Sequence, residues 1–373
     1  MELSEYLTFA NGRTSPPRSD NGVYPVYGAN GPIGKCGTPN FSGPAIVIGR
    51  VGSYCGNVQY VCGDFWATDN TIVATPLNSD EGYYWKGFLK NLDPRRLARG
   101  SGQPLVTQAD LKQITVKPPP RSIRVALGQV LGSLDDKIAA NQTAVSTGTE
   151  LLMSLYRRVQ KHSAEPFGQV CDVFGGSTPS TKIDEYWGGS INWATPTDLT
   201  ALQGPWLSDT ERKITEAGLK SMSSALHPSG SILMTSRATI GHVAVAATPV
   251  TTNQGFIVIR TTEDLVPWAF CQLQDRVREF EAWSNGATFL EISRGNFKKL
   301  PFYRAEPQDL AEFNAKAKPL LNMCKAKQAE NITLAKSRDE LLPLLMSGKI
   351  TVKEASQEAA AAGAQVTREE NEV

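Results

Sequence analysis

Apolar side chains recur at intervals of mostly three and four residues between Arg121 and Lys161. The stripe consists of Ile123, Leu127, Val130, Leu134, Ile138, Val145, Leu152, Leu155 and Val159, with Asn141 and Gly148 in its two remaining places. This heptad-like spacing predicts a helix of about 40 residues, roughly 60 Å long at ~1.5 Å per residue. Because a stripe of that length cannot be left in water, the helix needs a partner of similar length.

The chain contains such a partner between Pro307 and Lys349. Its stripe consists of Leu310, Phe313, Ala317, Leu320, Cys324, Ile332, Ala335, Leu342 and Leu345. Asn141 and Asn331 each stand nine residues before a Glu-Leu-Leu sequence, and both features are separated by 190 residues. A shared offset of this kind indicates an internal duplication. We therefore expect the two helices to pack against each other, with the two asparagines fixing their register.

Residues 1–118 have the pattern of a β-rich domain. Short apolar runs such as Ala45–Ile48 and Asn70–Ala74 alternate with turn sequences such as Asn21-Gly22. A helix is expected at Gly82–Leu92, and Pro118-Pro119-Pro120 interrupts the chain just before the first long helix.

Residues 164–302 repeat this plan. Gly230–Arg237 corresponds to Gly43–Arg50, and Thr252–Val258 corresponds to the segment that starts at Thr68. We pair Arg50 with Arg237 because each leaves an apolar run. The opening element of the first domain is shorter than its counterpart in the second.

The predicted fold class is therefore α+β, with two β-rich domains in a pseudo-two-fold arrangement, joined and separated by two long antiparallel coiled-coil helices. The β-rich domains occupy residues 1–118 and 164–302. The long helical spacers occupy residues 119–163 and 303–350, and the Ala- and Glu-rich tail, residues 351–373, is expected to be disordered.

Composition excludes several classes of protein. With 40% hydrophobic and 20% charged residues, no apolar run long enough for a membrane span and no secretory signal pattern, the sequence predicts a soluble cytoplasmic protein without membrane contact. The net charge is only +1, but residues 1–163 carry 17 basic and 12 acidic side chains and the remainder carries 21 and 25. Nucleic-acid binding would therefore depend on local basic patches.

No catalytic or metal-binding constellation is evident. The chain lacks the Asp/Asn-Pro-Pro-Tyr/Phe loop of amino-methyltransferases and the GxxxxGK[ST] loop of ATPases. Cys36, Cys55 and Cys62 fit no zinc spacing, and buried apolar thiols are the favoured reading. We expect no cofactor in this chain.

The order of several motifs resembles the specificity (S) subunits of type I DNA restriction-modification systems. The motifs are Ser133–Asn141 in the first long helix, Pro118–Pro120 before it, and Trp66–Thr71 and Thr252–Phe256 in the two domains. The resemblance covers about residues 1–350, and the order of the motifs together with the duplication is more specific than any single motif.

Several functional expectations follow from this resemblance. It implies two target-recognition domains, each reading one half of a bipartite double-stranded DNA sequence, in a chain without catalytic activity. It also implies two methyltransferase (M) subunits and two restriction (R) subunits as partners. S-adenosylmethionine, ATP and Mg²⁺ are expected on those partner subunits.

Candidate DNA contacts are long donors and amides at strand ends and in basic loops. In the first domain they are Arg50, Tyr54, Asn57, Asn70, Arg95, Arg96 and Arg99. In the second they are Arg237, Thr239, His242, Asn253, Gln254, Lys298 and Lys299. The alternatives are surface arginines without a partner and amides that satisfy a local turn.

Some features remain open to other readings. Trp187, Trp193 and Trp206 are more often core residues than a surface on which bases stack. Asp135-Asp136-Lys137 and Arg157-Arg158 are either solvated or a docking surface for methyltransferase subunits. The alternative function is a non-enzymatic coiled-coil scaffold whose β-rich domains bind protein or carbohydrate. A steep loss of affinity with salt would favour DNA.

Overall fold

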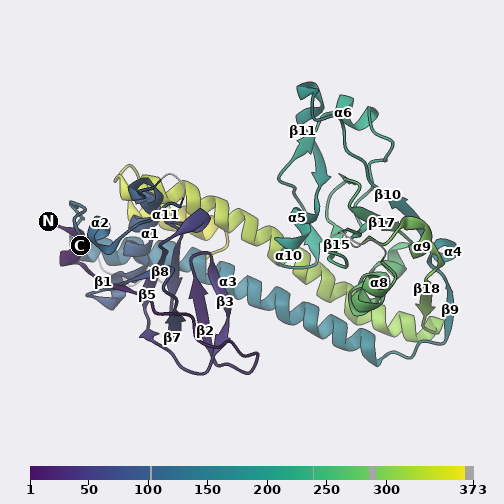
Figure 1. Ribbon diagram of the computed structural model, residues 1–373, viewed down its shortest axis with the longest axis horizontal. Coiled ribbons are helices and arrows are strands. Elements are labelled where there is room, and N and C mark those ends of the chain that lie inside the picture. Colours follow the sequence, from purple (N-terminus) through teal and green to yellow (C-terminus); the bar gives the residue numbers. More distant parts are fainter. Residues whose placement is uncertain (101–102, 238, 285–290, 366–373) are drawn as a thin grey trace. The chain divides into compact units, whose positions relative to one another are not determined.

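The computed structural model describes residues 1–100, 103–237, 239–284 and 291–365 (Figure 1). The chain divides into two compact units. Unit 1 combines Met1–Ile138 with Thr333–Val373, and unit 2 is Ala139–Ile332. Each unit therefore contains one β-rich domain and a portion of each long helix. Within the described residues, no helix combines the length and apolar character needed to cross a membrane.

Unit 1 is built around an antiparallel sheet in the order β1-β8-β5-β6 and a smaller sheet in the order β3-β2-β7-β4. The strands of the first sheet are β1 Leu7–Asn11, β8 Thr71–Pro76, β5 Ala45–Gly49 and β6 Val58–Val61. Those of the second are β3 Gly31–Cys36, β2 Tyr24–Gly28, β7 Asp64–Ala67 and β4 Phe41–Ser42. All five residues of β5 are buried, which explains its uninterrupted apolar run.

Unit 2 has a sheet in the order β10-β17-β14-β15-β12 and a smaller one in the order β13-β11-β16. The strands of the first are β10 Asp172–Gly175, β17 Phe256–Arg260, β14 Ile232–Thr235, β15 Val243–Ala246 and β12 Trp206–Leu207. Those of the second are β13 Lys213–Ile214, β11 Trp187–Ala194 and β16 Val250–Thr252. A two-stranded sheet pairs β9 Ser163–Pro166 with β18 Pro301–Arg304.

The two units share strand order and pairing sense. In unit 1, β8 pairs antiparallel with both β1 and β5, and in unit 2 β17 pairs antiparallel with both β10 and β14. The parallel pair of β2 with β7 likewise corresponds to the parallel pair of β11 with β16. The internal duplication predicted from the sequence is thus confirmed at the level of topology.

Short helices complete both units. In unit 1 these are α1 Gly82–Leu92 and α2 Gln108–Lys112, the first with the bounds expected from the sequence. In unit 2 they are α4 Phe167–Val170, α5 Pro196–Thr200, α6 Glu216–Lys220, α7 Val266–Asp275, α8 Val277–Ala282 and α9 Arg294–Lys299.

The two long helices are α3, Arg121–Arg158, and α10, Pro307–Met346. Within unit 2, Asn141 bonds to Asn331 while Tyr156 packs against Phe313, so the helices run antiparallel. The predicted antiparallel pairing is confirmed, but Ile123 and Ile332, which were placed on the apolar stripes, are 43% and 53% exposed and do not belong to the packed core. Within unit 1, a Cβ added to Gly87 in α1 would lie 2.8 Å from Cδ1 of Leu131 and 3.1 Å from Cδ1 of Leu342. The domain therefore packs closely against both helices.

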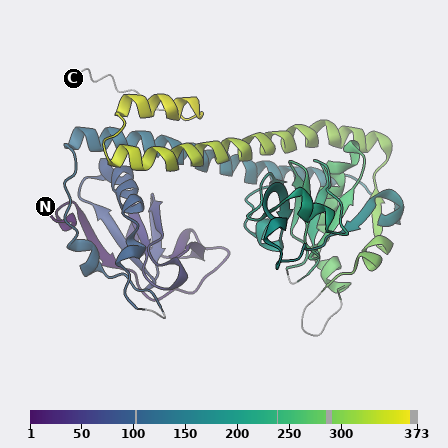
Figure 2. The same cartoon turned by 90° about the horizontal axis from the view of Figure 1, so that it is seen from above.

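The structure corrects the expectations for the tail and for Asp135. Residues 352–361, expected to be disordered, form α11, Val352–Ala361, which lies alongside the end of α10 (Figure 2). Ala355 and Ala359 of α11 are fully buried in the core of unit 1. Residues 366–373 of the predicted tail lie outside the described residues.

The second difference concerns Asp135, which was expected to be solvated or part of a docking surface. Its carboxylate pairs with Lys86 of α1 and, at 2.8 Å, with Arg338 of α10. The neighbouring Asp136 accepts a hydrogen bond from the hydroxyl of Tyr83. Burial, together with this bond, raises the pKa of Tyr83. Asp135 is thus part of the internal packing of unit 1.

Candidate nucleic-acid interface

In unit 1, the candidate residues meet at the edge of the sheet where β5 ends. Arg50 follows β5 directly, and its backbone N–H donates to the carbonyl of Asn70 at 2.8 Å. The Arg50 carbonyl accepts from the N–H of Val106 at 3.0 Å. The Nε of Arg50 is buried and has no hydrogen-bond partner among the described residues. The half-buried Arg50 and the exposed Asn70 therefore lie side by side.

The loop after Arg50 brings further candidates to this edge. It includes a short 3-10 helix, Gly52–Tyr54, and the side chain of Tyr54 is 53% exposed. Gly56 has a φ of +85°, and a Cβ there would lie only 2.4 Å from the backbone nitrogen of Arg95. Glycine is thus required where the loop touches the basic segment. The Asn57 amide donates to the carbonyl of Ala29 at 3.4 Å.

The basic segment presents three exposed arginines. Arg96 pairs with Asp93 at 3.2 Å, and Arg99, whose side chain is 81% exposed, pairs with Asp110 at 2.6 Å. Hydrogen bonds from Thr107, with a smaller contribution from Arg99, outweigh burial and hold the pKa of Asp110 below its usual value. Arg95 forms no ion pair within the described part of the chain. The loop after β5, the turn at Asn70 and the basic segment are thus adjacent, and together they carry all seven candidates of the first domain.

Arg13 belongs to the same edge but was not among the candidates. Its backbone N–H donates to the carbonyl of Ala67 at 2.9 Å, next to the turn that leads into Asn70, and its side chain is exposed. The signal available in the sequence was weak, since it consists of one basic residue after Asn11-Gly12.

In unit 2, three candidates follow β14. The Nε of Arg237 lies 2.9 Å from Oε1 of Glu291, close enough for an ion pair although the angle falls short of a hydrogen bond. Thr239 is exposed, and its N–H donates to the carbonyl of Arg237 at 2.7 Å. His242 is exposed at the end of the same loop.

The two amides of unit 2 are held in local bonds. Oδ1 of Asn253 accepts from the N–H of Gly255 at 2.8 Å, which is an Asx turn. Oε1 of the exposed Gln254 accepts from the Thr178 hydroxyl at 2.6 Å. The N–H of Ser236, directly after β14, donates to the carbonyl of Gly255. These amides therefore lie at the edge that carries Arg237, and Asn253 has the turn role considered as its alternative.

The lysines of α9 are not brought to that edge. A Cβ added to Gly168 in α4 would lie 3.1 Å from Cβ of Lys298. The α4 helix precedes β10, whereas the loop of Arg237 lies near the other end of β10, where Gly175 pairs with Ile257. Lys298 and Lys299 are both exposed but stand apart from the other candidates.

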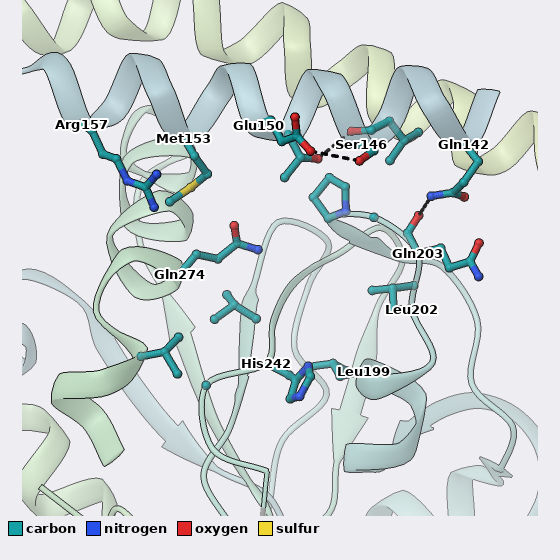
Figure 3. Close-up of a pocket in the computed structure, with 17 residues that line it drawn as sticks. Gln142, Ser146, Glu150, Met153, Arg157, Leu199, Leu202, Gln203, His242 and Gln274 are labelled. Atoms are coloured by element: carbon teal, nitrogen blue, oxygen red, sulfur yellow. Dashed lines mark hydrogen bonds between the residues drawn. The ribbon is translucent and has the colours of Figure 1, made fainter. Parts of the chain in front are cut away.

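His242 also borders a cavity of about 580 Å³ within unit 2 (Figure 3). One wall is a polar face of α3 that includes Gln142, Glu150 and Arg157. The amide of Gln142 donates to the carbonyl of Gln203 at 3.1 Å on the rim. His242 thus lines the space between α3 and the β-rich domain, in addition to being accessible to solvent.

Strand register shows which positions of the two units are equivalent. Gly49 pairs with Thr71, and Thr235 pairs with Phe256. The residue after Gly49 is Arg50, and the residue after Thr235 is Ser236, so Arg50 corresponds to Ser236.

The next positions agree with this assignment. An isolated bridge joins Val51 to Leu105, and an equivalent bridge joins Arg237 to Glu291. Arg237 therefore corresponds to Val51, and our pairing of Arg50 with Arg237 was wrong by one residue. The error arose because the sequence comparison paired two arginines, whereas backbone hydrogen bonds decide which positions are equivalent.

Both repeats match a single known family. Residues 1–146 and 166–303 each match the family described as the Type I restriction modification DNA specificity domain, and together they span more than half of the chain. The chain belongs to this family.

Individual relatives agree with the assignment. The chain is 37% identical over 175 residues to the Type I restriction enzyme MjaIX specificity subunit of Methanocaldococcus jannaschii, covering 46% of this chain and 40% of that protein. It is 26% identical over 121 residues to the EcoprrI specificity subunit of Escherichia coli, covering 32% and 29%. The matched part thus spans less than half the length of these relatives.

A solved structure has a similar fold. The crystal structure of the S subunit of the type I restriction-modification system from M. genitalium covers 93% of this chain and 95% of its own, with a TM-score of 0.60 and 14% identity. This likeness concerns the α+β fold with its repeated domains and long helices.

The tryptophans of the second specificity domain serve in packing. Trp193 is buried, and its indole N–H donates to the carbonyl of Ser177 at 3.1 Å. Trp206 donates to the carbonyl of Leu321 in α10 at 2.8 Å. The guanidinium carbon of Arg212 lies 3.6 Å from the ring centre of Trp187, so the two side chains form a cation–π contact.

Metal ligands do not assemble in either specificity domain as far as the chain is described. Cys36 and Cys55 are buried thiols, and Cys62 is exposed. Burial raises the pKa of the Cys55 thiol, and partial desolvation together with the negative charge of Asp136 raises that of the Cys62 thiol. Both shifts disfavour the thiolate that a metal requires.

Proposed function

We propose that this chain is a non-catalytic specificity subunit that reads a bipartite sequence in double-stranded DNA, with one specificity domain for each half-site. The observation that carries the proposal is the repeat itself. Two domains with the same strand order and register present different side chains at the edge where β5 and β14 end. Modules that share a backbone but differ at its reading edge suit two different half-sites.

The long helices support a fixed spacing of the half-sites. α3 and α10 each contribute residues to both units, so neither domain is attached through a flexible linker alone. Asn141 and Asn331 supply a defined register in this helix pair. We propose that this pair sets the number of base pairs between the half-sites.

The proposed partners are two methyltransferase subunits and, in the full complex, two restriction subunits. S-adenosylmethionine, ATP and Mg²⁺ would be bound by those subunits rather than by this chain. The family membership and the absence of an ATPase or methyltransferase motif in the sequence support this division of roles.

The decisive experiment varies the gap between the half-sites. The target is first obtained by sequencing the methylated positions of a host genome with and without this chain. Binding of the full chain with its methyltransferase partner is then measured on duplexes whose gap is longer or shorter by one or two base pairs. We expect specific binding to be lost with either change. Equal binding across several gap lengths would refute a fixed spacing.

Salt dependence separates DNA binding from a scaffold role. Specific and non-specific affinity should both fall steeply as salt increases, by on the order of a thousandfold for six to ten phosphate contacts between low and moderate salt. If the chain shows no affinity for DNA at any salt concentration, the scaffold function becomes the favoured alternative.

A further inference from the structure

The equivalent positions of the two specificity domains differ in charge at the proposed reading edge. Arg50 corresponds to Ser236 by strand register. Arg13 corresponds to Ser177, because their N–H groups donate to the equivalent carbonyls of Ala67 and Thr252. Two cations of the first domain are thus replaced by two hydroxyls in the second.

Three arginines of the first domain lack an internal counter-charge in the described part of the chain and are available for an external anion. In the described residues, no carboxylate lies within 4.0 Å of the guanidinium of Arg13, Arg50 or Arg95. The three residues come from separate segments that meet at one edge. Arg50 is bonded to the turn at Asn70, and Arg95 touches Gly56 in the loop after Arg50.

The second domain has an arginine one position further on, but its charge is compensated. Arg237 lies 2.9 Å from the carboxylate of Glu291, and both side chains are about 40% exposed. The equivalent pair in the first domain is Val51 and Leu105. At this bridge the second domain therefore has a cation and an anion where the first has two apolar side chains, so the net charge of the bridge is zero in both domains.

The wider charge distribution follows the same trend. Residues 1–118 hold 11 basic and 9 acidic side chains, whereas residues 164–302 hold 11 and 14. Two arginines of the second domain also contact other side chains of the same domain. Arg212 covers Trp187, and the buried Arg276 pairs with Glu279 at 2.7 Å. The exposed Arg294, which begins α9, remains available, so the second domain is less cationic at its edge but not devoid of cations.

We propose that the two specificity domains hold DNA unequally: Arg13, Arg50 and Arg95 of the first domain neutralise phosphates, whereas Arg237 of the second is neutralised by Glu291 and contributes little to phosphate binding. The proposal rests on DNA being the ligand, as proposed above. It makes the first domain the electrostatic anchor and leaves the second to contribute mainly through hydroxyls, amides and shape.

The test uses the dependence of affinity on salt. Each neutralised phosphate contributes about −0.9 to the slope of log K against log salt concentration on duplex DNA. The full chain is titrated with a mixed-sequence duplex of about 40 base pairs at several salt concentrations. This probe reports phosphate contacts without knowledge of the target sequence.

Four substitutions and a control make the comparison. Arg13→Gln, Arg50→Gln and Arg95→Gln should each make the negative slope less steep by about one. Arg237→Gln should leave the slope nearly unchanged, because its charge is already compensated. Lys353→Gln is the control and should also leave the slope unchanged, because it removes an exposed cation from α11, which lies on the other side of α10 from the sheets of unit 1 (Figure 2). Circular dichroism and thermal unfolding check that each variant is folded.

The informative opposite variant is Glu291→Gln. Removing this carboxylate frees Arg237, and the slope should then become steeper by about one. An unchanged slope in Glu291→Gln, or a loss in Arg237→Gln equal to that in Arg50→Gln, would overturn the unequal anchoring. If the unmodified chain shows no salt-dependent binding to any duplex, the proposed DNA function itself fails, which is a separate outcome.

Discussion

Asn141 donates a hydrogen bond from Nδ2 to Oδ1 of Asn331 at 2.9 Å, which joins the two copies of one sequence feature. The same Nδ2 lies 3.0 Å from Oε2 of Glu330. Asn141 is only 2% exposed, so its amide is a buried polar group within an otherwise apolar stripe. Such a group stabilises only the register in which its partner is present, and it penalises shifted pairings.

We predict that Asn141→Ala lowers the free energy of unfolding by about 1–3 kcal/mol, because a buried hydrogen-bond network loses its donor. The measurement is urea unfolding followed by circular dichroism. The control is Thr143→Ala, since the exposed hydroxyl of Thr143 bonds to the carbonyl of Ala139 within the same helix. If both variants unfold at the same urea concentration, the asparagine pair is not a significant source of stability.

Unit 1 is held together by a different interaction, a buried ion pair between Glu81 and Arg124. Arg124 of α3 reaches the Glu81 carboxylate through Nε at 2.7 Å and Nη2 at 2.9 Å, and the Trp85 indole N–H donates to it at 2.9 Å. The side chain of Glu81 is 1% exposed. Burial alone would raise the pKa of Glu81, but the bonds from Arg124 and Trp85 outweigh it and lower the pKa.

We predict that Glu81→Gln costs about 3–5 kcal/mol, because it leaves the Arg124 cation buried without its counter-charge. The matched control is Asp80→Asn, which removes the half-exposed partner of Arg121 and should cost less than about 1 kcal/mol. Urea unfolding at neutral pH measures both. Equal effects would show that the buried pair adds nothing beyond a surface pair.

The pH dependence gives a second readout of the same carboxylate. Because the pKa of Glu81 is lower in the folded state, its contribution is complete above the unfolded value of about 4.3 and is lost as pH falls through the folded value. As pH falls below about 5, the stability of the natural chain, measured by urea unfolding, should therefore decline more steeply than that of Glu81→Gln.

The sequence was informative where a pattern extends over many residues. The stripes of α3 and α10 repeat often enough to define two helices and their mutual pairing, and the shared offset of Asn141 and Asn331 correctly anticipated their contact. The bounds of α1 were likewise set by local signals. The family could be inferred from the order of its motifs, which no single residue decides.

The candidate site was less accessible to sequence reasoning. Its geometry depends on register, and the one-residue error in pairing Arg50 with Arg237 arose because similar side chains need not occupy equivalent backbone positions. Partners distant in sequence were also missed, such as Arg338 for Asp135 and Glu291 for Arg237. The local sequence around each residue contains no signal for such contacts, because the fold creates them.

The helix α11 shows how an apparently low-complexity segment can be ordered. Thr351 forms a capping box with Glu354, in which the Thr351 N–H donates to the Glu354 carboxylate at 2.8 Å. The small side chains of Ala355 and Ala359 let the helix pack closely against the core that contains Leu341 and Leu345. Order in this tail therefore depends on tertiary packing as well as on the cap.

We predict that Ala359→Asp destabilises unit 1 by more than about 2 kcal/mol, because it places a carboxylate in the apolar contact between α11 and the core. The control, Ala360→Asp, introduces the same residue one position further along, where the side chain is exposed, and should change stability by about 0.5 kcal/mol. Hydrogen exchange of the α11 amides, read alongside urea unfolding, should show loss of protection only for Ala359→Asp. Equal loss in both variants would mean that helix propensity, rather than packing, holds α11 in place.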